Sequence, residues 1–375
     1  MHELGARLKK VKKIFVISHM ACGGAQRVLS TVANAYVQRG HDVVIITFSN
    51  GREVFFPLVE GVRTIYLDCF GKSAGILDAL RSNWIRITRL RRILKALVPG
   101  NIMSFMPETS VIVLLATIGI RGSRVIVSER SVPTKDKIGK VWQVLRKLSY
   151  KLADKITVNS VDAKREIELI VRSGVIEYLP NILCLKDDYN RGQVASRTMD
   201  SKSILTVSRL SREKRVDVLL AALGALEKEG VLGDWKILVA GDGPEKTSLM
   251  ALCDVLGIAE RVQFLGWVGD SSALYEAASL FVLCSEYEGT PNALLEAMAY
   301  GLPVITSRCS QEVERLVVKS KCGAVYDVGD VAALGRLIRT FLEDQHLRQE
   351  MGHRALGAVQ RYMPENAIPA WEKVI

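Results

Sequence analysis

Cysteine pairs and long apolar segments are both missing from this chain of 375 residues. Its seven cysteines are scattered, and no Cys-x-x-Cys pair occurs, which argues against a zinc site or a disulfide framework and favours a reducing compartment. The longest apolar run, residues 110–120, is too short to cross a bilayer. The apolar run 14–17 that follows the N-terminal lysines is too brief for a secretory signal. We therefore expect a cytoplasmic protein, either free or lying on the cytoplasmic face of a membrane.

Aromatic residues are also sparse, at 6% of the chain. They offer few surfaces on which bases could stack, and no nucleic-acid-binding signature is present, so nucleic acid is not expected as a partner. The turn after the first predicted strand lacks Gly-x-Gly-x-x-Gly, which disfavours a nicotinamide-dependent dehydrogenase. No Asp-x-Asp sequence is present to hold a divalent cation. We expect neither a metal nor a cofactor.

Positive charge, by contrast, is in excess, with a net charge of +11. Residues 1–185 carry 29 Lys+Arg against 14 Asp+Glu, whereas residues 186–375 carry 22 against 26. The excess therefore belongs to the first half of the chain, which is expected to face an anionic partner.

Strand and helix patterns alternate along the whole chain, which predicts an α/β protein with parallel sheets. A polar stretch interrupts the alternation, and the pattern then starts again. We expect two Rossmann-like domains facing across a cleft, over residues 1–185 and 201–361, joined by a linker at 186–200. In the second domain the pattern predicts strands at 203–208, 236–240, 262–265, 280–284 and 303–306.

The most informative motif runs from Glu288 to Gly301. Thr290 suits an N-cap and Pro291 the first position of a helix, while Gly301 suits the residue after the helix end. Glu288 should then lie at the helix N-terminus, where free N–H groups face an anion. Glu296 should lie about one and a half turns further on, close enough to face the same ligand. Amides for phosphate and carboxylates for hydroxyls suit a sugar nucleotide.

Two cations, Arg209 and Lys214, follow the apolar run 204–207. The carboxyl end of a parallel strand is where this architecture binds ligands, so the two side chains could bind an anion there. They could equally be solvated charges at the entry to a helix.

Together these two segments resemble the retaining glycosyltransferases of family four, which have the GT-B fold. In that family the first glutamate, here Glu288, contacts the donor sugar, and the second, here Glu296, the nucleotide ribose. The family motif Gly-Arg-Leu-x-x-x-Lys-Gly binds the donor diphosphate through its Arg and Lys, here Arg209 and Lys214. The resemblance implies that the donor is also contacted by the loop and helix start between the glutamates, at Gly289, Thr290, Pro291 and Asn292.

The chain departs from the family pattern at two points. Ser208 and Arg215 replace the two glycines of the diphosphate motif. Many relatives also carry a histidine at the segment Ser128-Glu129-Arg130, where this chain has none. We expect Glu129 and Arg130 to serve acceptor or sugar hydroxyls, or else to form a surface salt bridge.

Three further loops complete the expected site. Gly23 and Gly24, after the first strand, resemble a Gly-Gly loop that the family places between donor and acceptor, and His19 could reach the same place. Gly241 resembles part of a Gly-x-Gly-Pro turn near the nucleotide. Trp267 and Val268 resemble the segment that binds the base.

The resemblance implies transfer of a hexose or N-acetylhexosamine from a nucleotide-diphosphate sugar, with UDP the expected nucleotide, to a glycan acceptor. The acceptor is expected to be lipid-linked and part of a cell-envelope polysaccharide. In relatives the C-terminal helix returns to the first domain, which residues 362–375 could do here. A sugar-nucleotide epimerase of the same fold and a non-catalytic, membrane-bound sugar-nucleotide binder are the alternatives.

Two basic amphipathic segments, residues 80–97 and 137–155, could lie on an anionic membrane surface. In the first, an apolar stripe that includes Trp84 alternates with arginines. In the second, Trp142 and Leu145 lie among lysines and arginines. The alternative is that both stripes pack on the domain's own sheet.

Overall fold

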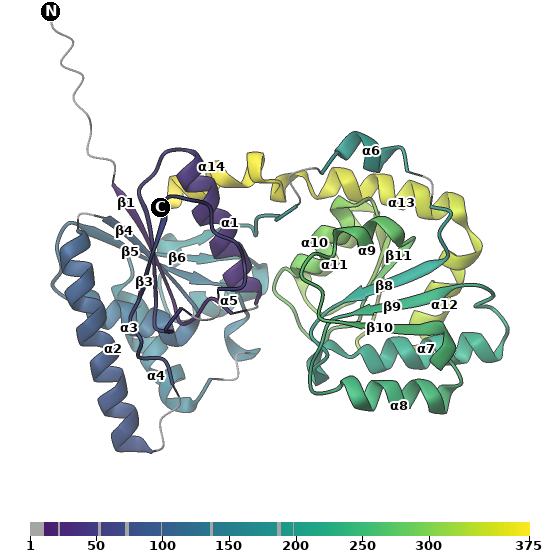
Figure 1. The fold of residues 1–375 in the computed structure, drawn as a ribbon, viewed down its shortest axis with the longest axis horizontal. Helices are drawn as coiled ribbons and strands as arrows, with labels where there is room; N and C mark the ends of the chain where they lie inside the picture. The colour runs from purple at the N-terminus through teal and green to yellow at the C-terminus, as the bar shows by residue number, and fades with distance from the viewer. Residues whose placement is uncertain are drawn as a thin grey trace, which may run out of the picture. The chain divides into compact units, whose positions relative to one another are not determined.

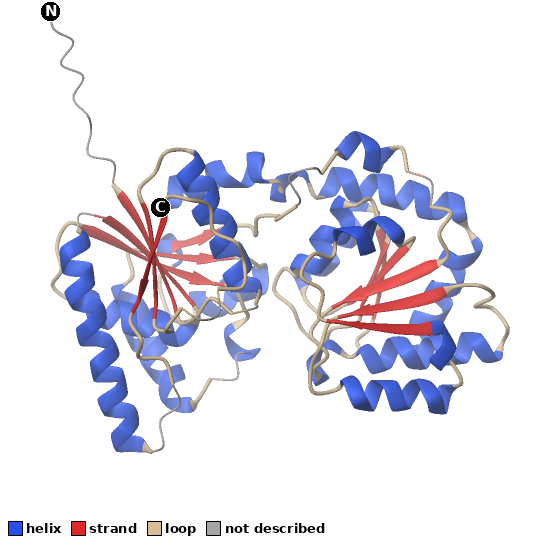
Figure 2. Cartoon of the chain, in the orientation of Figure 1, coloured by secondary structure: helices blue, strands red, loops and turns tan. Residues whose placement is uncertain are grey.

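The computed structural model describes residues 11–21, 23–51, 54–71, 75–98, 100–135, 138–185, 189–197 and 199–375. The chain divides into two compact units. Unit 1 comprises residues 1–184 and 364–375, and unit 2 comprises residues 185–363. Each has a parallel sheet covered by helices, so the predicted α/β class with two parallel-sheet domains is confirmed (Figure 2).

Unit 1 is a doubly wound domain whose sheet has, among the described residues, seven parallel strands in the order β3-β2-β1-β4-β5-β6-β7 (Figure 1). The strand order reverses direction between β1 and β4, and ligands of such sheets bind outside the carboxyl ends of the strands at that point. The strands are β1 (Lys12–Ile17), β2 (Val43–Thr47), β3 (Val62–Tyr66), β4 (Gly100–Phe105), β5 (Ser123–Glu129), β6 (Lys155–Val158) and β7 (Ile176–Tyr178). The helices are α1 (Gly24–Gln38), α2 (Ile76–Leu97), α3 (Pro107–Thr117), α4 (Lys140–Ser149), α5 (Val161–Glu168) and α14 (Pro364–Val374).

The strands of unit 1 are apolar on both faces, as buried parallel strands must be. In β1, Ile14 and Val16 face the core that α2, α3 and α5 cover. Phe15 and Ile17, one residue out of step, face the core that α1 and α14 cover. Side chains of a strand alternate between the two faces, so the run KKIFVI supplies both cores at once.

Helix α14 is bound to unit 1 by its aromatic residue, Trp371. This side chain is fully buried, and its indole Nε1 donates to the Pro180 carbonyl oxygen at 3.0 Å. The guanidinium of Arg130 lies 4.5 Å from the centre of the indole ring, a cation–π distance. The last helix of the chain is therefore part of the first sheet's packing.

Unit 2 repeats the doubly wound plan with a sheet that has, among the described residues, six parallel strands in the order β10-β9-β8-β11-β12-β13. Here the order reverses between β8 and β11. The strands are β8 (Ser203–Val207), β9 (Lys236–Ala240), β10 (Val262–Gly266), β11 (Leu280–Leu283), β12 (Val304–Ser307) and β13 (Gly323–Tyr326). The helices are α6 (Arg191–Ala195), α7 (Val216–Lys228), α8 (Lys246–Leu256), α9 (Ser272–Ala277), α10 (Asn292–Ala299), α11 (Gln311–Ser320), α12 (Val331–Glu343) and α13 (Gln345–Ala358).

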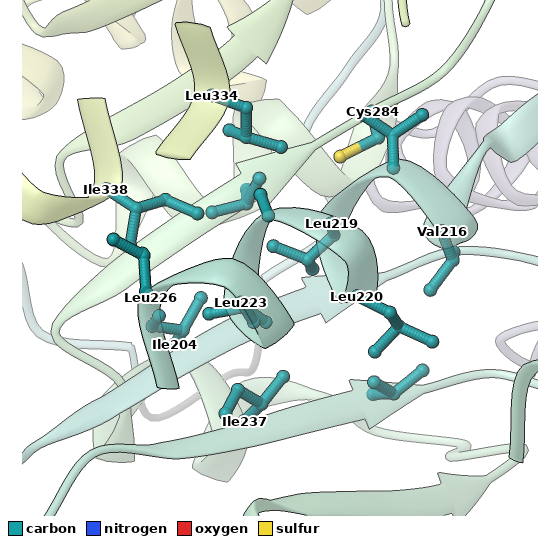
Figure 3. Packing of buried hydrophobic residues seen from close by; sticks show 14 of the residues in the cluster. Ile204, Val216, Leu219, Leu220, Leu223, Leu226, Ile237, Cys284, Leu334 and Ile338 are labelled. Atoms are coloured by element: carbon teal, nitrogen blue, oxygen red, sulfur yellow. The ribbon is translucent and has the colours of Figure 1, made fainter. Parts of the chain in front are cut away.

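The core of unit 2 is centred on α7. Leu219 and Leu223 of this helix pack with Ile204 and Ile237 of the central strands and with Ile338 of α12 (Figure 3). All five are buried. This packing holds the carboxyl end of β8, where Arg209 and Lys214 follow, in a fixed position.

Two elements of unit 2 have no counterpart in the predicted pattern, α11 and β13. Strand β13 is only four residues long and begins with Gly323, a weak strand former. A Cβ atom at Gly323 would lie 1.8 Å from the Val304 carbonyl oxygen, so the close pairing with β12 requires the glycine. The predicted linker, 186–200, also carries the short helix α6, which belongs to unit 2; residues 186–188 and 198 of it lie outside the described residues.

Candidate active site

A cation and a carboxylate pair directly at the switch point of the unit 2 sheet. Lys214 follows β8, and Glu288 lies in the loop between β11 and α10. The Lys214 Nζ is 2.6 Å from Glu288 Oε1, and Ser285 Oγ donates to the same oxygen at 2.7 Å. Two of the predicted site residues, 74 positions apart in the sequence, therefore meet where this architecture binds ligands.

The second predicted cation, Arg209, is held close by through Glu213. Arg209 Nη2 donates to Glu213 Oε1 at 2.7 Å, and Ser211 Oγ donates to that oxygen at the same distance. The Glu286 backbone N–H in turn donates to the Glu213 carbonyl oxygen at 2.8 Å. Because this bond joins the β8 loop to the β11 loop, both cations belong to one rim, and the Arg209 side chain remains largely exposed there.

Glu213 makes the stability of this rim depend on pH. Burial raises the pKa of Glu213, but hydrogen bonds from Ser211, its own backbone N–H and Arg209 outweigh burial and lower the pKa to about 2. The folded state thus binds fewer protons than the unfolded chain, so this stabilisation is complete above about pH 4.5 and is lost as the pH falls towards 2. We expect Glu213→Gln to remove about 3 kcal/mol of acid-dependent stability, measured by urea unfolding between pH 6 and pH 2. Glu260→Gln, at an exposed position of unit 2, should leave the acid profile unchanged, and an identical profile for Glu213→Gln would contradict the assignment.

Helix α10 begins one residue later than predicted. Its first residue is Asn292 and its N-cap is Pro291, whose side chain cannot cap by hydrogen bonding, so the prediction of a Thr290 cap is wrong. The ring of Pro291 fixes φ but leaves ψ free, so this residue can have the extended backbone (ψ 123°) of an N-cap. At the other end the prediction is confirmed: Gly301 has φ +69°, and the N–H groups of residues 301 and 302 bond back to the carbonyl oxygens of 298 and 297, a Schellman ending.

The second glutamate of the motif, Glu296, points into the interior of unit 2. The residue is 3% exposed, and its Oε2 accepts a hydrogen bond from Tyr275 Oη at 3.1 Å. Of the four residues between the glutamates that were predicted to contact the donor, Thr290 and Pro291 are buried, whereas Gly289 and Asn292 are partly exposed. The predicted donor loop therefore offers both a solvent-facing and an interior surface.

Replacement of the two motif glycines does not disturb the β8 loop. Ser208 continues the strand pairing, with its N–H bonded to the Ala240 carbonyl oxygen at 3.0 Å. Arg215 takes the left-handed backbone conformation (φ +47°, ψ 40°) that a glycine adopts without strain. Its guanidinium is held by both carboxylate oxygens of Asp217, at 3.1–3.3 Å. A residue other than glycine in this conformation carries strain of about 1–3 kcal/mol, and a partly exposed ion pair such as this one contributes about 0–1 kcal/mol against it.

A third loop approaches the same rim very closely. Gly241, after β9, has φ +136°, and a Cβ atom there would lie 1.8 Å from the Ser208 carbonyl oxygen. Only glycine fits this contact. The Gly241 N–H donates to the Gly266 carbonyl oxygen at 2.7 Å, which connects the loop to the segment with the exposed Trp267 and the half-buried Val268. The predicted nucleotide segments are thus neighbours at the carboxyl edge of the sheet.

In unit 1 the predicted residues after β1 gather at that sheet's own switch point. Gly23 is the N-cap of α1, with extended backbone (φ 173°), and Gly24 is its first residue. The buried Gln26 lies 3.4 Å from His19, between Nε2 and Nδ1, and also approaches the sulfur of Met106, the residue after β4, at 3.9 Å. Gln26 was not predicted to be a site residue; the signal that the sequence offered was an amide side chain two residues after the Gly-Gly pair.

Glu129 and Arg130 do not form a surface salt bridge, so that alternative is wrong. Glu129 is 1% exposed, and its carboxylate accepts from the hydroxyl of Tyr150 and lies 3.8 Å from the buried Arg146. Arg130 donates to the Leu179 carbonyl oxygen at 2.9 Å besides covering the ring of Trp371. Burial lowers the pKa of Arg130 to about 9. Both side chains serve the packing of unit 1, and a role for either towards an acceptor stays a prediction.

None of the helices that the structure describes combines the length and the apolar character that spanning a bilayer requires. Within the same part of the chain, no three His, Cys, Asp or Glu side chains are grouped so as to hold a metal ion.

Two doubly wound parallel sheets, with a cation–carboxylate pair at the switch point of the second, define the class of this protein: the GT-B architecture. Solved structures share it at 18% identity, a level that speaks for the fold alone. Sucrose-phosphate synthase from Thermosynechococcus elongatus matches with a TM-score of 0.79 over 97% of this chain and 98% of its own. Anabaena HepE, crystallised with UDP, matches with a TM-score of 0.78 over 97% and 99%.

Two family models match consecutive parts of the chain. Residues 23–181 match the glycosyl transferase 4-like domain, and residues 191–357 match the glycosyl transferases group 1. Between them they cover most of both units. The chain belongs to the GT-B glycosyltransferases that combine these two domains, and it is a glycosyltransferase.

Its curated relatives carry matching names. An enzyme of Campylobacter jejuni is 29% identical over 97% of this chain and 98% of its own length. It is named as the α-1,4-N-acetyl-D-galactosaminyltransferase of GalNAc-α-(1→4)-GalNAc-α-(1→3)-diNAcBac-PP-undecaprenol. A glycosyltransferase of Haemophilus influenzae is 27% identical over 97% of this chain and all of its own.

Proposed function

We propose that this glycosyltransferase moves a hexose or N-acetylhexosamine from UDP to a lipid-linked glycan, with retention of configuration and without a metal ion. The observation that carries the proposal is the Lys214–Glu288 pair at the unit 2 switch point, with Arg209 on the same rim. It supplies, at one place, cations for a diphosphate and a carboxylate for a sugar.

The cations account for departure of the nucleotide. When the bond between the anomeric carbon and the diphosphate breaks, negative charge grows on the phosphate oxygens, and fixed positive groups stabilise it without reorganising. Arg209 and Lys214 lie in the same loop after β8, and the backbone bond from Glu286 to Glu213 holds that loop against the loop that carries Glu288, so the two cations can contact both phosphates. This is the part that a divalent metal would otherwise play.

The carboxylate accounts for binding of the sugar. Lys214 and Ser285 both donate to Oε1 of Glu288, which fixes the carboxylate plane and leaves Oε2 to accept from sugar hydroxyls. With the leaving group held on one face by the cations, an acceptor that arrives on that face gives retention. A donor phosphate oxygen is then the base that takes the acceptor's proton.

The identity of donor and acceptor is proposed from the relatives. The Campylobacter jejuni relatives are named as N-acetylgalactosaminyltransferases of undecaprenol-linked saccharides, and the HepE structures contain UDP or UDP-glucose. The test is to incubate the pure protein with UDP-N-acetylgalactosamine, UDP-N-acetylglucosamine, UDP-galactose and UDP-glucose, each with undecaprenyl-diphosphate saccharides, and to follow product mass and anomeric configuration by NMR. Transfer with inversion, or only from a non-uridine donor, would overturn the finer assignment.

We further propose that unit 1 lies on an anionic membrane surface, chiefly through α4. Trp142 and Leu145, the stripe expected to meet lipid, are turned partly inward, with Trp142 against the core. The exposed face instead carries large apolar side chains spaced three or four residues apart beside lysines spaced seven and four residues apart. What we call the α4 face extends from α4 into the 3₁₀ turn Tyr150–Leu152 that follows it, and consists of Val141, Val144, Leu148 and Leu152 with Lys140, Lys147 and Lys151.

Helix α2 contributes less than its sequence predicts. Leu90 and Leu94 of its stripe are fully buried, although Trp84 is 68% exposed. Arg86 and Arg89 donate to backbone carbonyl oxygens of residues 67–71 and so serve the fold rather than a partner. A cavity of about 720 Å³, whose charged lining residues are Lys151, Arg172 and Glu168, opens beside the α4 face.

Reversing charge on the α4 face should abolish membrane binding. Because each cation near an anionic bilayer contributes about 1 kcal/mol, we expect the triple change of Lys140, Lys147 and Lys151 to Glu to weaken binding about 100-fold or more. Flotation with vesicles containing phosphatidylserine measures it, over a range of salt concentration.

The matched control makes the same charge change on unit 2, with Lys228, Lys236 and Lys319 replaced by Glu; all three are exposed. Flotation of this control should equal that of the wild type. Equal loss in both triples would reduce the effect to net charge, and a wild-type protein that does not float would end the proposal.

A further inference from the structure

The carboxylate of Glu296, which we assign to binding the ribose, is hydrogen-bonded to a buried tyrosine hydroxyl. Tyr275 of α9 is 1% exposed, and its hydroxyl donates to Glu296 Oε2 at 3.1 Å. A carboxylate removed from water is costly unless hydrogen bonds satisfy it. Burial of the Glu296 carboxylate in α10, a helix otherwise rich in Leu and Ala, therefore costs free energy, and packing alone does not explain it.

Tyr275 is itself fixed by other aromatic rings. Its ring stacks on that of Tyr300, with centroids 5.6 Å apart and planes 16° apart, and Tyr300 meets Tyr189 edge to face at 5.5 Å. Tyr189 donates through its hydroxyl to the Ala299 carbonyl oxygen at 2.7 Å, at the end of α10. The three rings hold the Tyr275 hydroxyl at one position relative to the helix that carries Glu296.

We propose that Tyr275 is a positioning residue for the nucleotide: it orients the Glu296 carboxylate for the ribose hydroxyls and so sets the affinity for the donor. This rests on the proposed ribose role of Glu296. A tyrosine hydroxyl bonded to Oε2 fixes the rotation of the carboxylate before the nucleotide arrives, so binding loses less conformational freedom. Tyr275 touches neither the sugar nor the diphosphate, and the chemical step does not depend on it.

Tyr275→Phe separates orientation from packing, because it keeps the ring and removes only the hydroxyl. Losing a hydrogen bond to a charged group should weaken UDP binding roughly tenfold or more, measured by calorimetry. The donor KM should rise by the same factor while kcat stays within about twofold. The control is Tyr362→Phe: Tyr362 is also buried in unit 2, with its hydroxyl 3.3 Å from the buried carboxylate of Glu312, and UDP affinity should not change.

The same measurements in a Glu296→Ala background and with 2′,3′-dideoxy-UDP show whether Tyr275 acts through Glu296. If Tyr275 acts through Glu296, Tyr275→Phe has no further effect once Glu296 is gone, and its effect vanishes for the nucleotide without ribose hydroxyls. Equal weakening in both backgrounds would reduce Tyr275 to a structural residue and overturn the inference. If Glu296→Ala weakens UDP binding but Tyr275→Phe does not, the inference fails and the ribose role stands. If Glu296→Ala leaves UDP affinity unchanged, the ribose role itself fails.

Discussion

Lys214→Ala is expected to lower kcat by a factor of 10² or more while leaving the protein folded. The reason is the charge on the departing diphosphate: a preorganised cation at a developing negative charge contributes about 3–4 kcal/mol to the transition state. Lys214 is partly buried and is already held by Glu288 at 2.6 Å, so no reorganisation precedes its action. The measurement is initial rates of sugar transfer at saturating donor, with thermal unfolding in parallel.

Lys202→Ala is the matched control. Lys202 also makes an ion pair in unit 2, with Asp234 at 3.2 Å, but it immediately precedes β8 and therefore lies at the amino end of the strand, away from the site. Its replacement should leave kcat unchanged. Wild-type turnover in Lys214→Ala would refute the leaving-group role, and so would a comparable loss in Lys202→Ala.

The sequence predicted the sheets better than the geometry of the site. Parallel strands such as β2, with the sequence VVIIT, are apolar on both faces and stand out between polar turns. Strand β13 was missed because GAVY carries no such signal and its register depends on a glycine contact with β12.

Within the site, the local sequence indicated which charged side chains could bind or react, but not which of them are exposed. The Arg209–Lys214 and Glu288–Glu296 spacings pointed to one rim, and the Lys214–Glu288 contact follows from the switch point between β8 and β11. Glu296 is buried against Tyr275 of α9, the helix that follows β10 in the sequence. This is a tertiary contact, and no pattern in the linear sequence indicates it.

The same limit explains the basic segments. Periodicity identified the amphipathic character of α4 but could not say which face meets the sheet. Because Trp142 packs partly inward, the exposed face is the one with Val144 and Leu148. In unit 1, charged residues at the end of a strand make structural contacts inside the domain. Glu129 accepts a hydrogen bond from Tyr150, and Arg130 covers the ring of Trp371.

Glu288→Gln is expected to lower kcat by about 10²-fold and to change UDP affinity little. The glutamine is isosteric and its amide oxygen can still accept from Lys214 and Ser285, so the loop should keep its conformation. What is lost is the negative charge that the proposed role places beside the anomeric carbon, where positive charge develops as the bond to the diphosphate breaks. A fixed charge of this kind is worth about 3 kcal/mol, which corresponds to about 10²-fold in rate. Rates at saturating donor and calorimetry with UDP measure the two quantities separately.

Glu286→Gln makes the same change two residues earlier, at an exposed carboxylate of the same loop, and should retain wild-type turnover. The double variant Lys214→Ala/Glu288→Gln should lose little more than the more damaged single variant, because the two side chains contact each other and act on one bond. Strictly multiplicative losses would instead mean that the pair does not act as a unit. Turnover unchanged in Glu288→Gln would remove the carboxylate from the chemical step and leave Lys214 with Arg209 as the whole of the catalytic charge.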